Sequence, residues 1–156
     1  METVPVKTPT LSIKPVTSDA DLEKIWPLLA QLYSGIDIRT LRARLHAVIS
    51  LGWRCAGLFS GEDDSEGPVA LAGYWITTRF CYGKYLYVDH FIVADHRRRA
   101  GLGRTLLGFL HDTAKREGCE RMVLDTFVAN DSAHRFWFDC GFKIVGFHFG
   151  KNLESE

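Results

Sequence analysis

A glycine-rich turn lies between a strand-like run of residues and a helix-like run, an order that suits the binding of a phosphate group. The turn is 97–103, with glycines at its fifth and seventh positions. A helix start presents backbone N–H groups without intrahelical partners, and glycine lets a ligand approach that backbone closely. Charged contacts to a pyrophosphate can come from Arg98, Arg99 and Arg104. The turn is therefore predicted to bind a phosphorylated ligand.

Two segments of the chain together resemble the signatures of a known enzyme family. Other nucleotide motifs are excluded, because position 106 is Leu, which leaves Gly-x-Gly-x-x-Gly incomplete, and no Gly-Lys-Ser/Thr occurs. The turn Arg98-x-x-Gly101-x-Gly103 resembles the acetyl-CoA pyrophosphate loop of the GNAT superfamily of N-acetyltransferases. Residues 130–142 are similar to the family's second signature, Asn-x-x-Ala-x-x-Phe-Tyr-x-x-x-Gly-Phe, with Trp137 in place of the usual Tyr.

This resemblance implies acetyl-CoA as the cosubstrate and assigns binding roles along the chain. In the GNAT fold the central strand splays from the next one, and its backbone binds the pantetheine arm in the gap. The residue that corresponds to Asn130 often faces that arm, and the tyrosine replaced by Trp137 can donate a proton to the departing thiolate. The expected cofactor-binding residues are Phe91, Ile92, Val93, Arg98, Arg99, Ala100, Gly101, Leu102, Gly103, Arg104, Asn130 and Trp137.

Acetyl transfer to an amine needs a base, because the amine is protonated at neutral pH. The central strand offers Asp89 and His90 as catalytic candidates. Because side chains alternate along a strand, we expect these two on opposite faces, so that one points away from the cleft and has a structural role. Related acetyltransferases often have an acidic residue here, which favours Asp89 as the base or as an anchor for a cationic amine, with His90 as the second choice. No metal is expected.

Apolar periodicity predicts the elements that position these residues. Strands are expected over 11–16, 53–60, 69–80, 85–93, 122–127 and 142–149. Helices are expected after a cap at Thr17 or Ser18, after a cap at Asp37, from Leu102 to Gly118, and over 132–139 with Asn130 as the cap. Hairpins combined with crossover helices predict an α/β fold with a mixed sheet and helices on both faces, as in the GNAT fold.

Length and composition favour one cytoplasmic domain. The chain has 156 residues, of which 46% are hydrophobic, so we expect a single acetyltransferase domain over 11–153 after a flexible N-terminus, 1–10. Basic and acidic residues both number 19, which excludes a strong bulk attraction to nucleic acid or an anionic membrane. No apolar run suits a signal peptide or a membrane span. The four cysteines form no Cys-x-x-Cys pair and are expected to be buried, reduced thiols.

The function that we expect is acetyl transfer from acetyl-CoA to a primary amine of a small molecule or peptide, by direct attack on the thioester. The alternative is an acyl-CoA-binding module or sensor without transfer activity, which the missing tyrosine at Trp137 motivates. Nucleic-acid binding through 96–99 is disfavoured, because this basic run coincides with the predicted phosphate turn and no aromatic platform adjoins it. A homodimer is common in the family and is compatible with the sequence.

Overall fold

The computed structural model describes residues 10–61 and 64–153, and the contacts among them divide the chain into two compact units. The first unit extends to Val123, and the second begins at Leu124. The expected flexible N-terminus, 1–10, lies outside the described residues except for Thr10. A single domain over 11–153 stays a prediction.

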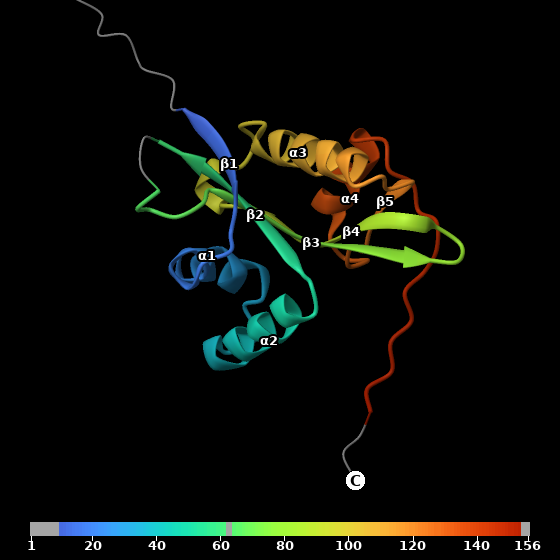
Figure 1. Cartoon of the computed structure of the whole chain (residues 1–156), viewed down its shortest axis with the longest axis horizontal. Helices are drawn as coiled ribbons and strands as arrows, with labels where there is room; N and C mark the ends of the chain where they lie inside the picture. Colours follow the sequence, from blue (N-terminus) through green and yellow to red (C-terminus); the bar gives the residue numbers. More distant parts are fainter. Residues whose placement is uncertain (1–9, 62–63, 154–156) are drawn as a thin grey trace, which may run out of the picture. The chain divides into compact units, whose positions relative to one another are not determined.

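A five-stranded sheet forms the centre of the first unit (Figure 1). Its strands lie side by side in sequence order: β1 (Leu11–Pro15), β2 (Arg54–Ser60), β3 (Ala70–Arg79), β4 (Gly83–Val93) and β5 (Arg121–Leu124). The first four strands pair antiparallel. A helix connects β4 to its neighbour β5, the kind of crossover that joins parallel strands. The predicted mixed sheet of an α/β fold is thus confirmed.

Helices lie on both sides of this sheet, as predicted. Figure 1 shows α1 (Asp19–Leu32) and α2 (Ile38–Ser50) on one side and α3 (Leu102–Arg116) on the other. Ser18, rather than Thr17, caps α1, and its hydroxyl accepts a hydrogen bond from the Asp21 N–H over 3.1 Å. The Asp37 carboxylate caps α2 by accepting the N–H groups of two residues in its first turn. These caps satisfy backbone donors that the helices themselves leave without partners.

Each side of the sheet has an apolar layer. On the side of α1 and α2, side chains from both helices join Cys55, Leu71 and Ile92 of the sheet in one buried cluster. On the other side α3 contacts β3 and β4, and its Leu106 and Leu110 are fully buried. Burial of one leucine side chain contributes about 1.5–3 kcal/mol to stability. The two layers hold β3 and β4 between them.

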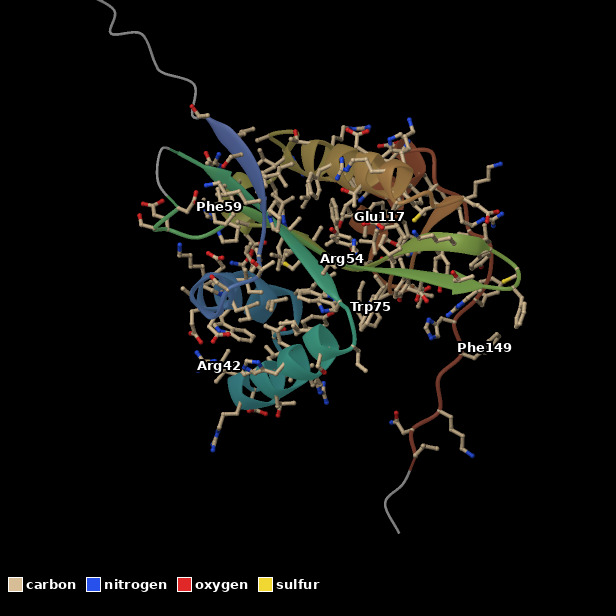
Figure 2. All side chains as sticks on the ribbon, viewed as in Figure 1. Arg42, Arg54, Phe59, Trp75, Glu117 and Phe149 are labelled. Carbon is tan, nitrogen blue, oxygen red and sulfur yellow. The ribbon has the colours of Figure 1, made fainter. Side chains whose placement is uncertain are left out.

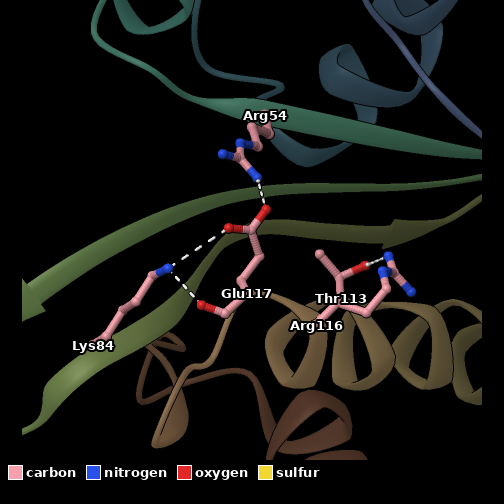
Figure 3. A network of polar contacts seen from close by, with 5 residues as sticks. All are labelled: Arg54, Lys84, Thr113, Arg116 and Glu117. Atoms are coloured by element: carbon pink, nitrogen blue, oxygen red, sulfur yellow. Dashed lines mark hydrogen bonds and ion pairs between the residues drawn. The ribbon is translucent and has the colours of Figure 1, made fainter.

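A polar network connects the C-terminal end of α3 to two strands (Figure 3). The Arg54 guanidinium of β2 donates a hydrogen bond to the Glu117 carboxylate, with a distance of 2.5 Å from Nη1 to Oε1. The Lys84 ammonium of β4 donates to the Glu117 carbonyl oxygen over 2.5 Å and lies 3.7 Å from Oε2 of the same residue. The hydrogen bond and the charge of Arg54 lower the pKa of the Glu117 carboxyl below its ordinary value of 4.5. Charge complementarity therefore stabilises this end of α3 against the sheet.

The second unit contains helix α4 (Asp131–Asp139) and a C-terminal segment without regular secondary structure. The predicted strand over 142–149 is wrong, because residues 142–153 form no strand. The Phe149 side chain, labelled in Figure 2, is 90% exposed. Similarly, the strand predicted over 122–127 ends at Leu124. Strand-forming residues make a strand only where a neighbouring strand supplies hydrogen bonds, and an apolar pattern does not reveal that neighbour.

The four cysteines are free thiols, as predicted, but only one of them is buried. Burial raises the pKa of Cys55, whereas Cys81 is exposed at the turn between β3 and β4. The expectation of buried thiols is therefore wrong for Cys81, which lies in an exposed turn, and Cys119 and Cys140 are only partly buried. Across residues 10–61 and 64–153, no helix has the length and apolar character that crossing a membrane requires.

Candidate active site

A β-bulge between β3 and β4 shapes the candidate site. The register pairs Gly73 with His90 and Tyr74 with Val88, so that Asp89 is an extra residue without a partner on β3. Such an insertion interrupts the alternation of side chains along the strand. As a result, Nδ1 of His90 lies 3.6 Å from Oδ2 of Asp89. The expectation that these two side chains lie on opposite faces is wrong, because the bulge brings them together.

Trp75 of β3 orients the carboxylate of Asp89. The indole Nε1–H of Trp75 donates a hydrogen bond to Oδ2 of Asp89 over 3.1 Å. The Trp75 side chain, labelled in Figure 2, packs against the apolar cluster formed by the sheet with α1 and α2. The Asp89 side chain is 27% exposed. The carboxylate is therefore held in place by the protein and still accessible to a ligand.

Two aromatic side chains fix the imidazole ring of His90. Tyr33, the C-cap of α1, places its hydroxyl 3.2 Å from Nδ1 of His90, and the two rings meet edge to face. Trp53 lies against the same imidazole, with ring centroids 5.5 Å apart. Gly73 permits this packing, because a Cβ at that position would lie 2.3 Å from the Trp53 ring. Burial and, secondly, the charge of Asp89 raise the pKa of Tyr33 to about 12, so its hydroxyl is protonated at neutral pH.

The C-terminal end of β4 contains the residues predicted to bind the pantetheine arm. The Ala94 N–H donates to the Val69 carbonyl oxygen over 2.9 Å, which directs the Ala94 backbone toward the β3 side. In an antiparallel pair, alternate residues direct their backbone groups to the same neighbour. The backbone of Ile92 therefore faces β3, and the backbone groups of Phe91 and Val93 face the opposite edge. Of the three predicted residues, Phe91 and Val93 have the orientation that binding of an extended ligand at this edge requires.

The glycine turn has the backbone geometry of an anion site. Gly101, in the left-handed region with φ 75°, precedes α3, and no side chain caps this helix. The N–H groups of Leu102, Gly103 and Arg104 in the first turn thus have no intrahelical partner. A Cβ on Gly101 would meet no atom of the described residues within 4 Å, so the space beside this backbone is open. Leu102, the first residue of this helix, is itself buried. These features fit the pyrophosphate of a coenzyme A thioester.

The arginines around this turn differ in their partners. Arg98 forms an ion pair with Asp95, with 2.8 Å between Nη2 and Oδ1. Arg99 is in the left-handed region with φ 64°, which costs a residue with a side chain about 1–2 kcal/mol. Ala100 is exposed between Arg99 and the turn glycine. Within the described part of the chain, the side chains of Arg99 and Arg104 form no hydrogen bond or ion pair. These two guanidinium groups are therefore available to a phosphate, whereas Arg98 is already paired.

Two of the predicted site residues belong to the second unit. Asn130 caps α4, since its Oδ1 accepts the Ala133 N–H over 3.2 Å, which confirms the capping role. Trp137 is 8% exposed, and its ring packs edge to face on Phe136 and Phe142, with centroid distances of 4.9 and 5.3 Å. Each residue thus has a structural role within its own unit, and their participation in cofactor binding stays a prediction.

The sequence alone did not indicate that Trp53, Trp75 and Tyr33 lie beside Asp89 and His90. These residues are separated from Asp89 along the chain. Pairing of β2, β3 and β4 and packing of α1 on the sheet bring them close. One signal was present: Gly73 lies inside an apolar strand, where glycine often marks a bulge or a close approach. Among the residues that the structure describes, no group of three or more His, Cys, Asp or Glu side chains could hold a metal ion.

Comparisons with known proteins agree with this architecture. The model of the Acetyltransferase (GNAT) family matches residues 23–142. The uncharacterized N-acetyltransferase YhdJ of Bacillus subtilis (strain 168) is 25% identical over 142 residues, which are 90% of this chain and 98% of that protein. The solved structure of aminoglycoside N-acetyltransferase AAC(6')-Iy in complex with CoA is similar with a TM-score of 0.80 and 16% identity, covering 98% of this chain and 100% of that one. The solved structure of glucosamine-6-phosphate N-acetyltransferase from Arabidopsis thaliana is similar with a TM-score of 0.69 and 24% identity, covering 93% of this chain and 99% of that one.

Proposed function

The chain belongs to the GNAT family of acetyltransferases, with acetyl-CoA as the donor, and we propose that it acetylates a primary amine of a small molecule or peptide. One observation carries the proposal. The bulge in β4 places an oriented, accessible carboxylate, Asp89, beside His90, a few residues before the strand edge and the glycine turn that suit a coenzyme A thioester.

The first requirement of the reaction is loss of a proton from the amine. A primary amine is protonated at neutral pH and has no lone pair for attack in that form. In the proposed mechanism Asp89 accepts this proton, directly or through water. The hydrogen bond from Trp75 supports this role, because it fixes one carboxylate oxygen while the side chain stays accessible.

In the second step the free amine attacks the thioester carbonyl carbon. The new C–N bond forms, the C–S bond breaks, and the electron pair leaves with the sulfur of coenzyme A. The nitrogen then loses its second proton, which the thiolate takes up directly or through water, so that the products are the amide and coenzyme A. The developing oxyanion needs a hydrogen-bond donor. The backbone orientation of Val93 supports its N–H in this role, because it faces the edge of β4 away from β3.

The phosphate end of the donor is proposed to bind at the glycine turn. Backbone N–H groups at the start of α3 provide donors and the positive end of the helix dipole. The side chains of Arg99 and Arg104, which have no partner among the described residues, add positive charge. Together these groups would hold the pyrophosphate, so that the thioester end of the donor lies near the bulge at Asp89.

Two classes of acceptor are consistent with this proposal. One solved structure with a similar fold is AAC(6')-Iy in complex with a bisubstrate analogue, in which coenzyme A is joined to an acetylneamine group. This analogue represents a small-molecule amine. Another is a ribosomal-protein-alanine N-acetyltransferase from Brucella melitensis, whose name gives a protein acceptor. In this chain the carboxylate of Asp89 lies near the aromatic side chains of Tyr33 and Trp75. A negative charge beside aromatic rings favours binding of an acceptor that carries a cationic amine.

The test is coenzyme A release from acetyl-CoA in the presence of polyamines, amino acids, aminoglycosides, lysine and a peptide with a free N-terminus. The proposal expects acceptor-dependent thiol release with at least one class. Binding of acetyl-CoA without thiol release for any amine would favour the acyl-CoA-binding module instead, the alternative that Trp137 motivates.

A further inference from the structure

We propose that Tyr33 is a positioning residue that holds His90 as the neutral imidazole with its proton on Nε2, which leaves Asp89 as the only base of the pair. The catalytic consequence rests on the proposed acetyl transfer. The tautomer itself does not, because it follows from the contacts of the imidazole ring in the protein.

The distances identify the partner of Nδ1 in His90. The Tyr33 hydroxyl oxygen lies 3.2 Å from this nitrogen, and Oδ2 of Asp89 lies 3.6 Å from it. A separation of 3.6 Å is beyond the range of a hydrogen bond between nitrogen and oxygen. Nδ1 therefore bonds to the hydroxyl of Tyr33 and makes only a longer-range electrostatic contact with the carboxylate.

The hydrogen-bond partners of the Tyr33 hydroxyl determine which of the two groups, Tyr33 Oη or His90 Nδ1, is the donor. Among the described residues, Tyr33 Oη has no other hydrogen-bond partner than His90. If Nδ1 carried the proton and donated it, the hydroxyl hydrogen of this partly buried tyrosine would have no acceptor among the described residues, which is unfavourable for a donor removed from water. If Tyr33 donates, one bond satisfies both groups. The raised pKa of Tyr33 is consistent with this, because the hydroxyl keeps its proton.

The ring of His90 cannot turn easily to exchange its two nitrogens. Tyr33 meets it edge to face with centroids 5.3 Å apart, and Trp53 packs against it in the space that Gly73 leaves open. Only 16% of the His90 side chain is exposed. With Nδ1 accepting from Tyr33, a neutral ring has its proton on Nε2. His90 is then a hydrogen-bond donor at Nε2 and has no free lone pair with which to deprotonate an amine.

The direct test is ¹⁵N NMR of protein labelled at the histidine nitrogens, recorded at neutral pH without any substrate. The His90 signals are assigned by their loss in His90→Gln. We expect an unprotonated Nδ1 and a protonated Nε2 in the natural protein. In Tyr33→Phe, which keeps the ring but removes the hydroxyl, we expect the Nδ1 signal to shift toward the protonated position. A protonated Nδ1 in the natural protein, or identical His90 signals in folded Tyr33→Phe, would overturn the proposal.

A second test separates the two nitrogens chemically. The side-chain amide of glutamine places an N–H near the position of Nε2, whereas that of asparagine places it near Nδ1. We expect kcat of His90→Gln to exceed that of His90→Asn by about fivefold, the effect of one hydrogen bond. An Asn variant as active as the Gln variant or more so would contradict the proposed donor. If the natural protein acetylates no amine, the proposed function fails while the NMR result still decides the tautomer.

Discussion

Trp75 and Asp89 are joined by a hydrogen bond across a β-bulge, with 3.1 Å between the indole Nε1 and the carboxylate Oδ2. Asp89 is the residue that has no pairing partner on β3, so the regular ladder does not determine the direction of its side chain. The indole from the neighbouring strand does so instead. The bulge thus supplies an extra carboxylate, and Trp75 determines where that carboxylate lies.

Trp75→Phe tests this relationship, because it keeps an aromatic ring and removes the N–H donor. We expect kcat/KM to fall about tenfold, since a hydrogen bond to a charged group contributes about 1.5–3 kcal/mol and a phenyl ring retains part of the packing. The matched control is Trp26→Phe, in the same apolar cluster, whose Nε1 has no hydrogen-bond partner among the described residues. Equal losses in kcat/KM for both variants would mean that packing, rather than the hydrogen bond, matters at Trp75.

Gly103→Val tests the phosphate turn. A branched side chain at the start of α3 should block the approach of a pyrophosphate to the backbone, and we expect acetyl-CoA affinity to fall at least about tenfold while the fold survives. Calorimetry measures the affinity, and circular dichroism measures the fold. Gly108→Val is the control, because it makes the same change at an exposed site in the same helix, where a Cβ has open space. Unchanged affinity in a folded Gly103→Val would refute the assignment.

The Glu117 network predicts a pH dependence of stability. The pKa of Glu117 is lowered in the folded protein, chiefly by the hydrogen bond from Arg54. The ionised carboxylate therefore contributes to folding stability above its ordinary pKa of 4.5, and this contribution is lost as the pH falls through the lower pKa of the folded state. Glu117→Gln lacks this contribution at every pH. Thermal melts should therefore show the largest difference in Tm between the two proteins above about pH 5 and a shrinking difference below it. A difference that grows toward acid would contradict the sign of this coupling.

Local chemistry allowed much of the fold to be predicted. Ser18, Asp37 and Asn130 are helix caps because their side chains satisfy N–H groups only two or three residues away. Gly101 precedes α3 in a left-handed conformation that glycine adopts readily. Contacts between neighbours in sequence depend on few other residues, so a local pattern was enough to predict them.

The arrangement of the site residues could not be predicted, because it depends on contacts between residues that are distant along the chain. The bulge at Asp89 is a property of the pairing between β3 and β4, and alternation applied to β4 alone gave the wrong face for one side chain. Trp53 and Tyr33 reach His90 only after β2 and α1 have packed on the sheet. The strand predicted over 142–149 failed for the same reason, since its residues suit a strand but pair with no strand among the described residues.

Trp137 allows a test of the leaving-group step, because the family usually has a tyrosine at this position. An indole N–H is a weak acid, but a coenzyme A thiolate leaves without full protonation, so we expect the enzyme to be active as it is. Trp137 is also packed between two phenylalanine rings in its own unit. Trp137→Tyr should therefore show little change in turnover or a loss, with acetyl-CoA binding measured separately. A large rise in turnover at unchanged affinity would show that the missing hydroxyl limits the natural protein.

The role of Asp89 as the base is tested most directly by the turnover of Asp89→Asn as a function of pH, measured as coenzyme A release with the best amine acceptor. Asparagine keeps the size of the side chain and removes the proton acceptor, while acetyl-CoA affinity, measured in parallel, should not change. We predict a fall in kcat of about 10²–10⁴ near neutral pH, and a partial recovery at high pH, where more of the amine is already free. Turnover equal to that of the natural protein at every pH would contradict the proposed role of Asp89.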